Sequence, residues 1–438
     1  MKLKCLFFSK DNTIYYLIIG ILISSIIIGI SNFSIAYSEP VIKDKNLKAV
    51  LVIHGLKNPT SMAFLGPNDV LVTEKSSGEV KRIINGNIQP ESLLKIPVAI
   101  KSERGLLGLD IAKHRNGPTF VFLYYTKSGG GKTGDDMLDN IKPAGNFLYR
   151  YELVNNHLIN PKLLLNLPAT PGPNHNGGKV LVGPDNNVYV IIGDLRSHRT
   201  QAQNIIDGNP VDNTSGILRV TQDGKPVPNS PFATSLPLNL YYAYGIRNSF
   251  GITFDPLTGK LWDTENGPNY GDEINFVDKG FNSGWSQVQG IWTPKGKIGN
   301  ENVGALVLNP SNKLVNFNEK GKYRQPAFIW YETVAPTALK FFNSTKLGKE
   351  YQNNLFVGDF NNGNLYDFKV NKNRTGLIVD NPYIKNNISY NQKDSDLISL
   401  GGGFDGGITD IKIGPKDGFL YILTLSGSIY RLSSTTIE

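Results

Sequence analysis

Short apolar segments that alternate with polar residues, separated by turns rich in Gly, Pro, Asn and Asp, recur along most of this sequence. Residues 66–82 show the unit: a Gly-Pro-Asn-Asp turn, an alternating strand, a Ser-Ser-Gly turn and a second strand that ends at Arg82. Such a unit predicts a β-hairpin. Related units occur at residues 117–151, 183–194, 255–265, 354–368 and 414–431. The pattern therefore predicts an all-β chain that contains the same hairpin six times.

Repeated hairpins at irregular spacing are typical of blades arranged around an axis, because a single hairpin cannot bury both of its faces. We therefore predict a six-bladed β-propeller that forms one domain over residues 41–438. The first strand candidate, residues 47–53, would pair with the last hairpin and close the ring without exposed edges. A β-sandwich and a parallel β-helix are the alternatives, since only the number of repeats separates them from the propeller.

Composition narrows the class of protein further. The 438 residues include 46 Gly and 25 Pro, with 40% hydrophobic and 19% charged residues, which supports many short strands and a large core. The net charge is +8, yet no run of Lys or Arg exceeds two residues, so we expect no nucleic-acid partner. Cys5 is the only cysteine, which excludes an intramolecular disulfide and a cysteine-based metal site.

The N-terminus has the pattern of an export signal. Three lysines lie among the first ten residues, an apolar run extends from Ile14 to Ile30, and small residues follow near Ala36–Ser38. Residues 1–38 are therefore predicted to be a signal peptide or an uncleaved membrane anchor, because about 17 apolar residues suffice for either role. We expect an exported protein that is secreted or held at the cell surface.

Three short motifs carry candidate chemistry. His175 lies in the Gly-rich run Gly172-Pro-Asn-His-Asn-Gly-Gly-Lys, where small residues let a substrate approach the imidazole. Arg247 and Asn248 supply several hydrogen-bond donors just before a strand. The acidic loop Glu265-Asn-Gly-Pro-Asn-Tyr-Gly-Asp-Glu offers oxygen ligands suited to calcium. A solvated histidine, an arginine that joins two blades and a solvated acidic loop are the structural alternatives. The sequence lacks the zincin, Walker and nucleophile-elbow motifs.

In combination these motifs resemble the glucose/sorbosone dehydrogenase family, the soluble aldose dehydrogenases that depend on pyrroloquinoline quinone (PQQ). Arg104-Gly-Leu-Leu-Gly-Leu-Asp, Asn174-His-Asn-Gly-Gly-Lys-Val, Gly245-Ile-Arg-Asn-Ser-Phe-Gly, the acidic loop and Val334-Ala-Pro-Thr occur in the family's order. The resemblance covers nearly the whole chain after residue 48 and is consistent with a six-bladed propeller.

The resemblance implies a sugar substrate, a PQQ cofactor with calcium, and an external electron acceptor. His175 would be the general base for the anomeric hydroxyl, and Arg247 would stabilise negative charge on the quinone oxygen. The carbonyls of Gly267 and Pro268 would bind calcium. The implied contacts to the cofactor are Arg247, Asn248, Thr337, Asn361 and Thr409.

Three positions depart from the family pattern. Gly407 and Thr409 stand where the family has arginines, and Asn361 stands where it has a lysine. The sequence therefore predicts that cationic contacts to the three carboxylates of PQQ are lost. Lys340, Lys179 and Arg196 are the candidate replacements.

Two other functions remain open at the level of sequence. A metal-dependent lactonase or hydrolase would use inward carboxylates, for which Asp194, Asp263, Asp359 and Asp410 are candidates, although such acids also stabilise turns. A surface propeller without catalysis would bind glycans or proteins. In either case the four tryptophans could form a stacking platform for sugar, although burial between blades is their more common fate.

Overall fold

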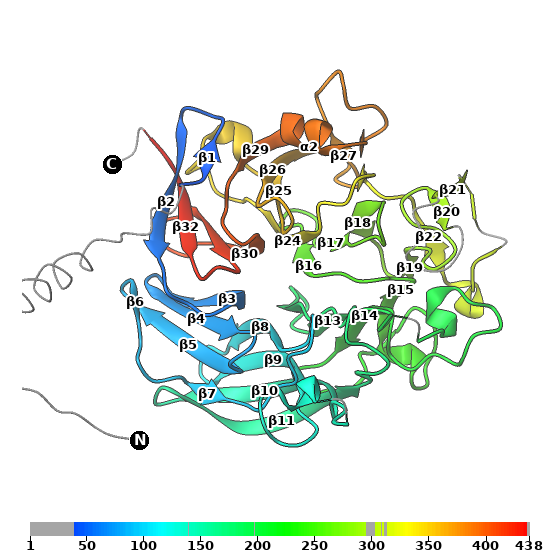
Figure 1. Ribbon diagram of the computed structural model, residues 1–438, viewed down its shortest axis with the longest axis horizontal. Coiled ribbons are helices and arrows are strands. Elements are labelled where there is room, and N and C mark those ends of the chain that lie inside the picture. Colours follow the sequence, from blue (N-terminus) through cyan, green and yellow to red (C-terminus); the bar gives the residue numbers. More distant parts are fainter. Residues whose placement is uncertain are drawn as a thin grey trace, which may run out of the picture. The chain divides into compact units, whose positions relative to one another are not determined.

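The computed structural model describes residues 39–435 except 139, 197, 295–302, 308 and 311–312. The residues from Glu39 onward form one compact unit. Its sheets stand side by side around a central axis, in chain order (Figure 1). The predicted all-β propeller architecture is confirmed. The predicted signal segment, residues 1–38, lies outside the described residues.

Within the described ranges, six sheets have four or more strands. The first sheet comprises β3 (Pro59–Gly66), β4 (Asp69–Glu74), β5 (Glu79–Ile84), β6 (Asn87–Ile88) and β7 (Leu94–Lys95). The second comprises β8 (Leu106–Lys113), β9 (Thr119–Lys127), β10 (Gly145–Val154) and β11 (His157–Leu167). The third comprises β12 (Val180–Val182), β13 (Val188–Ile192), β14 (Gly216–Val220), β15 (Tyr241–Tyr244), β19 (Phe281–Asn282) and β22 (Lys322–Tyr323).

The other three sheets follow in chain order. The fourth comprises β16 (Gly251–Phe254), β17 (Leu261–Glu265), β18 (Asp272–Val277), β23 (Phe328–Trp330) and β28 (Ile388–Ser389). The fifth comprises β24 (Pro336–Phe341), β25 (Leu355–Asp359), β26 (Leu365–Val370), β27 (Leu377–Ile378), β29 (Ser399–Gly402) and β1 (Val41–Ile42). The sixth comprises β30 (Ile408–Ile413), β31 (Leu420–Thr424), β32 (Ile429–Ser434) and β2 (Leu47–Ile53).

Little else interrupts the sheets. A small hairpin pairs β20 (Trp292–Pro294) with β21 (Val303–Leu306). The helical segments are α2 (Gln392–Ile398) and the short 3-10 turns Asp135–Met137, Gln201–Gln203, Leu238–Leu240, Phe317–Glu319 and Lys349–Tyr351. No helix among the described residues has both the length and the apolar character that a membrane span requires.

The ring is closed by pairing the two ends of the propeller chain. Strand β2 pairs antiparallel with β32, with Leu47 opposite Ser434 and Ile53 opposite Ile429. The sixth sheet thus takes its outer strand from the start of the propeller and its other three strands from the end. The predicted pairing of these two segments is confirmed, and it leaves β32 without a free edge.

The hydrophobic core lies between neighbouring sheets, in six clusters of buried side chains. Leu71 and Leu123 meet between the first and second sheets, and Tyr124 and Val190 meet between the second and third. Further clusters lie at each of the following junctions, the last between the sixth sheet and the first. Successive side chains along each strand point to opposite faces of the sheet. Both faces are buried, because every sheet has a neighbour on either side.

The first strand of each of the six sheets lies nearest the axis. Each of these inner strands (β3, β8, β12, β16, β24 and β30) contacts the next, and β30 contacts β3. Glycine permits the close approach of two of them: a Cβ at Gly108 on β8 would lie 2.0 Å from the carbonyl oxygen of Gly178, just before β12. The loops at the start of the inner strands therefore converge on a small region around the axis.

Candidate active site

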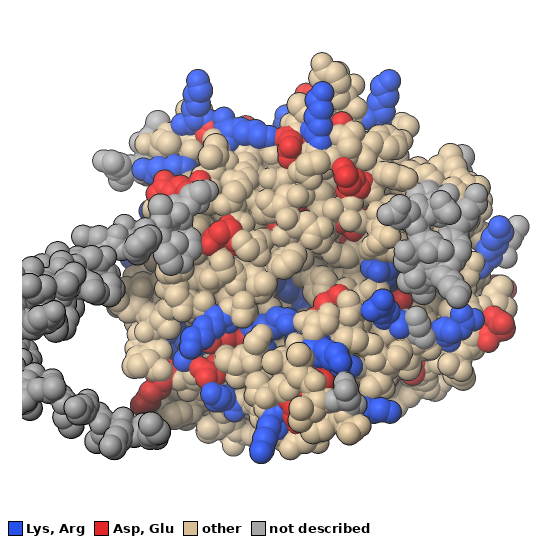
Figure 2. Space-filling view, in the orientation of Figure 1, with Lys and Arg blue, Asp and Glu red and all other residues tan. Residues whose placement is uncertain are grey.

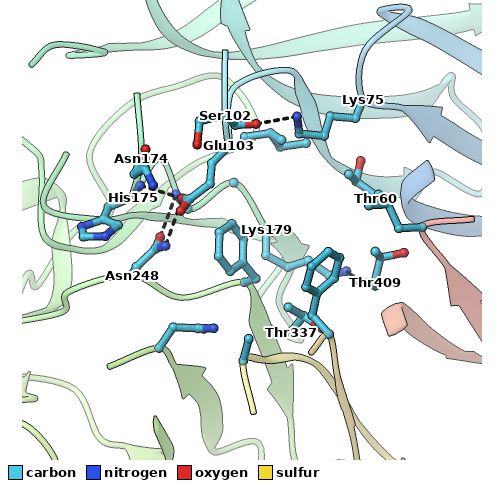
Figure 3. A pocket seen from close by; sticks show the side chains of 18 of the residues that line it. Thr60, Lys75, Ser102, Glu103, Asn174, His175, Lys179, Asn248, Thr337 and Thr409 are labelled. Atoms are coloured by element: carbon cyan, nitrogen blue, oxygen red, sulfur yellow. Dashed lines mark hydrogen bonds between the residues drawn. The ribbon is translucent and has the colours of Figure 1, made fainter. Parts of the chain in front are cut away.

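A cavity of about 600 Å³ lies where the inner strands begin. Most of the residues predicted from the sequence line it, although they come from four different sheets or the loops between them: His175, Arg247, Asn248, Gly267, Pro268, Thr337 and Thr409. Figure 3 shows His175, Asn248 and Glu103 on one side of it and Lys179, Thr337 and Thr409 on the other. In Figure 2 basic side-chain atoms are visible inside the central hollow of the face shown.

His175 is buried and is held by a carboxylate. Its Nδ1 lies 2.5 Å from Oδ1 of Asp194, and the indole Nε1 of Trp285 donates to the other oxygen of Asp194 at 2.8 Å. Burial acts to raise the pKa of Asp194, but the hydrogen bond from His175 and the charge of Arg247 outweigh it and lower that pKa. An ionised Asp194 fixes the imidazole proton on Nδ1, so Nε2 keeps the lone pair that can accept a proton.

The backbone at His175 adopts a left-handed conformation, with φ of 62°. Two neighbours hold this turn: the amide of His175 donates to Oε2 of Glu103 at 2.6 Å, and Nδ2 of Asn248 donates to the same oxygen at 3.0 Å. Glu103 thus joins the histidine loop to the Arg-Asn motif. Sequence reasoning missed Glu103, even though it directly precedes the Arg104 motif, because nothing in its local pattern predicts a contact 72 residues away.

Arg247 lies beside this pair, with its guanidinium 5.5 Å from the ring centre of Trp285. Its Nη1 donates to the carbonyl of Asn266 at 2.8 Å, and its amide donates to Oε1 of Glu265 at 2.7 Å. The buried Nε of Arg247 and Oδ1 of Asn266 have no partner within the described part of the chain. The site therefore holds a buried cation whose hydrogen-bonding capacity is not fully used.

The acidic loop is anchored by one carboxylate. Oδ1 of Asp272 accepts from the amide of Gly267 at 2.7 Å, and Oδ2 accepts from the amides of Val334 and Ala335 at 2.8 and 2.7 Å. Burial raises the pKa of Asp272 to about 6, against the effect of these three amides. Asp272 thereby fixes the Gly267-Pro268 turn at the cavity wall, where its backbone is in reach of a ligand.

This arrangement can be compared with known proteins. A family model described as glucose / sorbosone dehydrogenase matches residues 56–431. The chain belongs to the glucose/sorbosone dehydrogenase family.

Several relatives of the chain have named activities. The chain is 25% identical over 389 residues to the aldose sugar dehydrogenase YliI of Escherichia coli, with 86% of this chain and 90% of the relative covered. It is 23% identical over 436 residues to quinoprotein glucose dehydrogenase B of Acinetobacter calcoaceticus, with 87% and 86% covered. The PQQ-bound aldose sugar dehydrogenase of Streptomyces coelicolor shares the fold, with a TM-score of 0.62 at 20% identity, 90% of this chain and 99% of that chain being covered. These matches support an oxidoreductase of the sugar dehydrogenase class.

The structure gives a physical reason for one departure from the glucose/sorbosone dehydrogenase pattern. Gly407 has φ of 82°, and a Cβ there would lie 2.2 Å from the carbonyl oxygen of Phe360. An arginine at this position would be strained and would clash with backbone, so glycine is required by the local chain path. The predicted contact Asn361 is exposed and donates to the carbonyl of Thr333 at 3.3 Å. It is not among the described residues that line the cavity, whereas its neighbour Phe360 is.

The two threonines reach the cavity wall but also bond between sheets. Oγ1 of Thr409 donates to the carbonyl of Pro59 at 2.9 Å, from the sixth sheet to the first. Oγ1 of Thr337 donates to the carbonyl of Ile408, from the fifth sheet to the sixth. Both hydroxyls thus have a structural partner, and their roles toward a cofactor stay predictions.

Of the three candidate replacement cations, only Lys179 lines the cavity, where its Nζ lies 2.7 Å from Oδ1 of Asp410. Lys340 lines a different cavity, and Arg196 is exposed and lines neither. Lys75, which sequence reasoning missed, lines the cavity and donates from Nζ to the carbonyl of Ser102 at 2.8 Å. Two lysines and Arg247 therefore supply positive charge to this wall.

The four aspartates considered for a hydrolase do not converge. Asp194 holds His175, and Asp410 pairs with Lys179. Asp359 accepts from the hydroxyl of Tyr366 at 2.8 Å. Asp263 is fully buried, and burial raises its pKa well above the usual range. Their separate positions favour separate structural roles over a shared metal site.

The tryptophans also have separate roles. Trp262, Trp285 and Trp330 are fully buried, and Trp292 packs edge-on against Tyr331 at 5.2 Å. The indole Nε1 of Trp285 donates to Asp194, and Trp285 does not line the cavity. The four rings therefore do not form one exposed stacking platform.

Proposed function

We propose that this protein oxidises the anomeric hydroxyl of an aldose or a related alcohol, with PQQ as electron acceptor and calcium as its counter-ion, and passes the electrons to an external acceptor. The observation that carries the proposal is that His175, Arg247 and the Gly267-Pro268 turn, which lie far apart in sequence, line one cavity. The proposal takes each of the six larger sheets as one blade of the ring.

His175 would act as general base on the sugar hydroxyl. Asp194 holds its Nδ1, which leaves Nε2 to take the proton and then shares the positive charge that forms on the ring. The contact with Asp194 holds the ring, and the hydrogen bond from the amide of His175 to Glu103 fixes the backbone that carries it. Placing a fixed base beside a bound hydroxyl lowers the barrier through orientation as well as through proton transfer.

The cavity fits an acidic planar cofactor. Its volume of about 600 Å³ suits a small molecule, and Lys75, Lys179 and Arg247 supply cations where the family arginines are absent. The unused Nε of Arg247 and Oδ1 of Asn266 are free to take part in binding. PQQ bound here would accept the two electrons that are removed from the carbon that bears the sugar hydroxyl. Arg247 would stabilise the negative charge that develops on a quinone oxygen.

Calcium would use the carbonyl oxygens of Gly267 and Pro268, which are hard ligands of the kind calcium prefers. Asp272 fixes this turn through the amide of Gly267, so the two carbonyls are presented by a rigid loop. Export through residues 1–38 belongs to the same proposal, because lysines followed by an apolar run and small residues have the pattern of an export signal.

The test is reconstitution of residues 39–438 with PQQ and calcium, followed by turnover of an aldose panel with an artificial acceptor. Saturable oxidation that requires both PQQ and calcium, and that falls at least about 100-fold in His175→Asn, is the expected result. Lactone hydrolysis without quinone would instead establish the hydrolase, and glycan binding without turnover would establish the binding propeller.

Lys75 gives a sharper test of the cofactor. Lys75→Ala should weaken PQQ binding about tenfold, because one charge-assisted contact is worth roughly 1.5 kcal/mol or more. The measurement is a titration of the apoprotein with PQQ followed by fluorescence. Exposed Lys101, which does not line the cavity, is the matched control, and Lys101→Ala should leave the affinity unchanged. Equal effects of the two variants would argue against PQQ in this cavity.

A further inference from the structure

A second cavity, of about 500 Å³, lies at the opposite ends of the inner strands. Leu107, Thr337 and Thr409 line the first cavity, and the residues three positions later on β8, β24 and β30, namely Asp110, Lys340 and Lys412, line the second. At about 3.3 Å per strand residue, the two walls are about 10 Å apart along the axis. The second cavity is thus separate from the candidate active site.

The charged groups on its wall are two lysines and one aspartate. Lys412 lies 3.6 Å from Oδ2 of Asp410, which also pairs with Lys179 on its other side. Asp110 accepts from the amide of Val182 at 2.7 Å. This cluster holds three lysines, Lys179, Lys340 and Lys412, against the two carboxylates of Asp110 and Asp410, which leaves one positive charge without a counter-charge.

Lys340 carries that unmatched charge. Its ammonium has no hydrogen-bond or ion-pair partner among the residues that the structure describes. Burial, and then the neighbouring charge of Lys412, lower the pKa of Lys340 to about 8, while Asp110 and Asp410 act in the opposite direction. Lys340 is only partly buried and lines the cavity, so an anion that enters the cavity can reach its ammonium.

The remaining wall can hold a small ligand but cannot neutralise a charge. Phe64, Phe254 and Phe341 are among its lining residues, and Asn343 and Ser344 provide neutral polar groups. We propose that this cavity is a binding site for a small oxyanion held between Lys340 and Lys412. The two lysines come from neighbouring inner strands, β24 and β30, so the backbone of the ring holds them in place.

The test uses sulfate, which stays doubly charged across the working pH range. Isothermal titration of the folded domain at pH 7 and constant ionic strength should show one saturable site. Lys340→Met should weaken binding at least tenfold, and Lys340→Arg should retain it. Because Lys340 has no partner, removing its charge leaves no orphaned carboxylate, so the Met variant should fold. Lys412→Met is the second variant, and it should also weaken binding.

Lys101→Met, at an exposed residue that lines neither cavity, is the matched control and should bind sulfate normally. Loss of binding in Lys75→Met alone would place the anion in the first cavity and overturn the proposal. The absence of a saturable heat would also overturn the proposal. Equal heats in all variants would overturn it too, because they would reflect the general exclusion of sulfate from the protein surface and not binding at one site. Raising the pH to 9.5 should weaken binding, because Lys340 then loses its proton. The other charged groups nearby are Asp110, Asp410, Lys179 and Lys412.

Discussion

At the scale of single residues, the site depends on buried polar groups that hold one another. Asp194 contacts His175 and Trp285 and is fully buried. Glu103 joins the backbone of His175 to Asn248. Asp194 does not line the cavity and is a positioning residue, whereas Glu103 lines the cavity and also holds the backbone of His175. Their effect is to fix the tautomer and the orientation of one imidazole.

Replacing Asp194 by Asn should lower kcat by about 100-fold with little change in KM, because an amide cannot stabilise the imidazolium and favours the wrong tautomer. Steady-state kinetics of the reconstituted enzyme measure both constants. A variant that merely lost stability would show a lower Tm and an unchanged kcat for the folded protein.

At the scale of elements, turns on neighbouring sheets are joined by buried ion pairs. Arg374, in the turn after β26, donates from Nε to Asp255, in the turn after β16, and from Nη2 to the carbonyl of Asn353 at 3.0 Å. Asp255 is fully buried. The guanidinium also lies 5.2 Å from the ring centre of Phe341. This contact fixes the fourth sheet against the fifth.

Arg374→Ala should destabilise the domain by about 3 kcal/mol, since it leaves a buried carboxylate without its partner. The exposed pair of Lys260 and Asp278, 3.4 Å apart, is the matched control, and Lys260→Ala should change the unfolding free energy by less than about 0.5 kcal/mol. Urea unfolding followed by tryptophan fluorescence compares the two. A change of similar size in both variants would contradict the assigned role of Arg374.

At the scale of the whole molecule, stability depends on closing the ring. Strand β2 supplies the outer edge of the sixth sheet, with Leu47 and Ile53 buried. Without it, β32 presents an unpaired edge, and the ring loses part of the cluster that joins the sixth sheet to the first.

A chain that starts at Gly55 should therefore lose its cooperative thermal transition and aggregate. A chain that starts at Asn46 loses β1 but keeps β2, and it should remain monodisperse and fold. Size-exclusion chromatography and near-UV circular dichroism separate the two outcomes. A sharp unfolding transition at the same temperature for both chains would show that closure by β2 is dispensable.

Buried carboxyl groups should also make stability depend on pH. Burial raises the pKa of Asp367 to about 7, and its Oδ1 has no partner in the described residues. The folded state thus holds this proton more tightly than the unfolded chain, so the stability that depends on it is complete below about pH 4 and is lost as the pH rises to about 7.

Asp367→Asn should remove this dependence and stabilise the protein at pH 8 by about 1–3 kcal/mol relative to the wild type, with little gain at pH 4. Thermal unfolding at the two pH values tests it. A gain of equal size at both would mean that the carboxyl group does not titrate as described.

The sequence by itself determined the repeated hairpins, the pairing of residues 47–53 with the last hairpin and the three motifs around His175, Arg247 and Gly267. Alternation and turn residues are local signals, so they can be read without the fold. Their order along the chain was enough to indicate the family.

Only the tertiary structure decided which side chains meet at the axis. The contacts of Glu103 and Lys75 and the ion pair between Lys179 and Asp410 join residues from different sheets and loops, and no local pattern encodes such contacts. It also separated Lys340 from the candidate active site by placing it three residues further along its inner strand than Thr337. The physical reason is that the inner strands β3, β8, β24 and β30 each pass from one cavity to the other, so the position along the strand, and not residue type, sets which cavity a side chain faces.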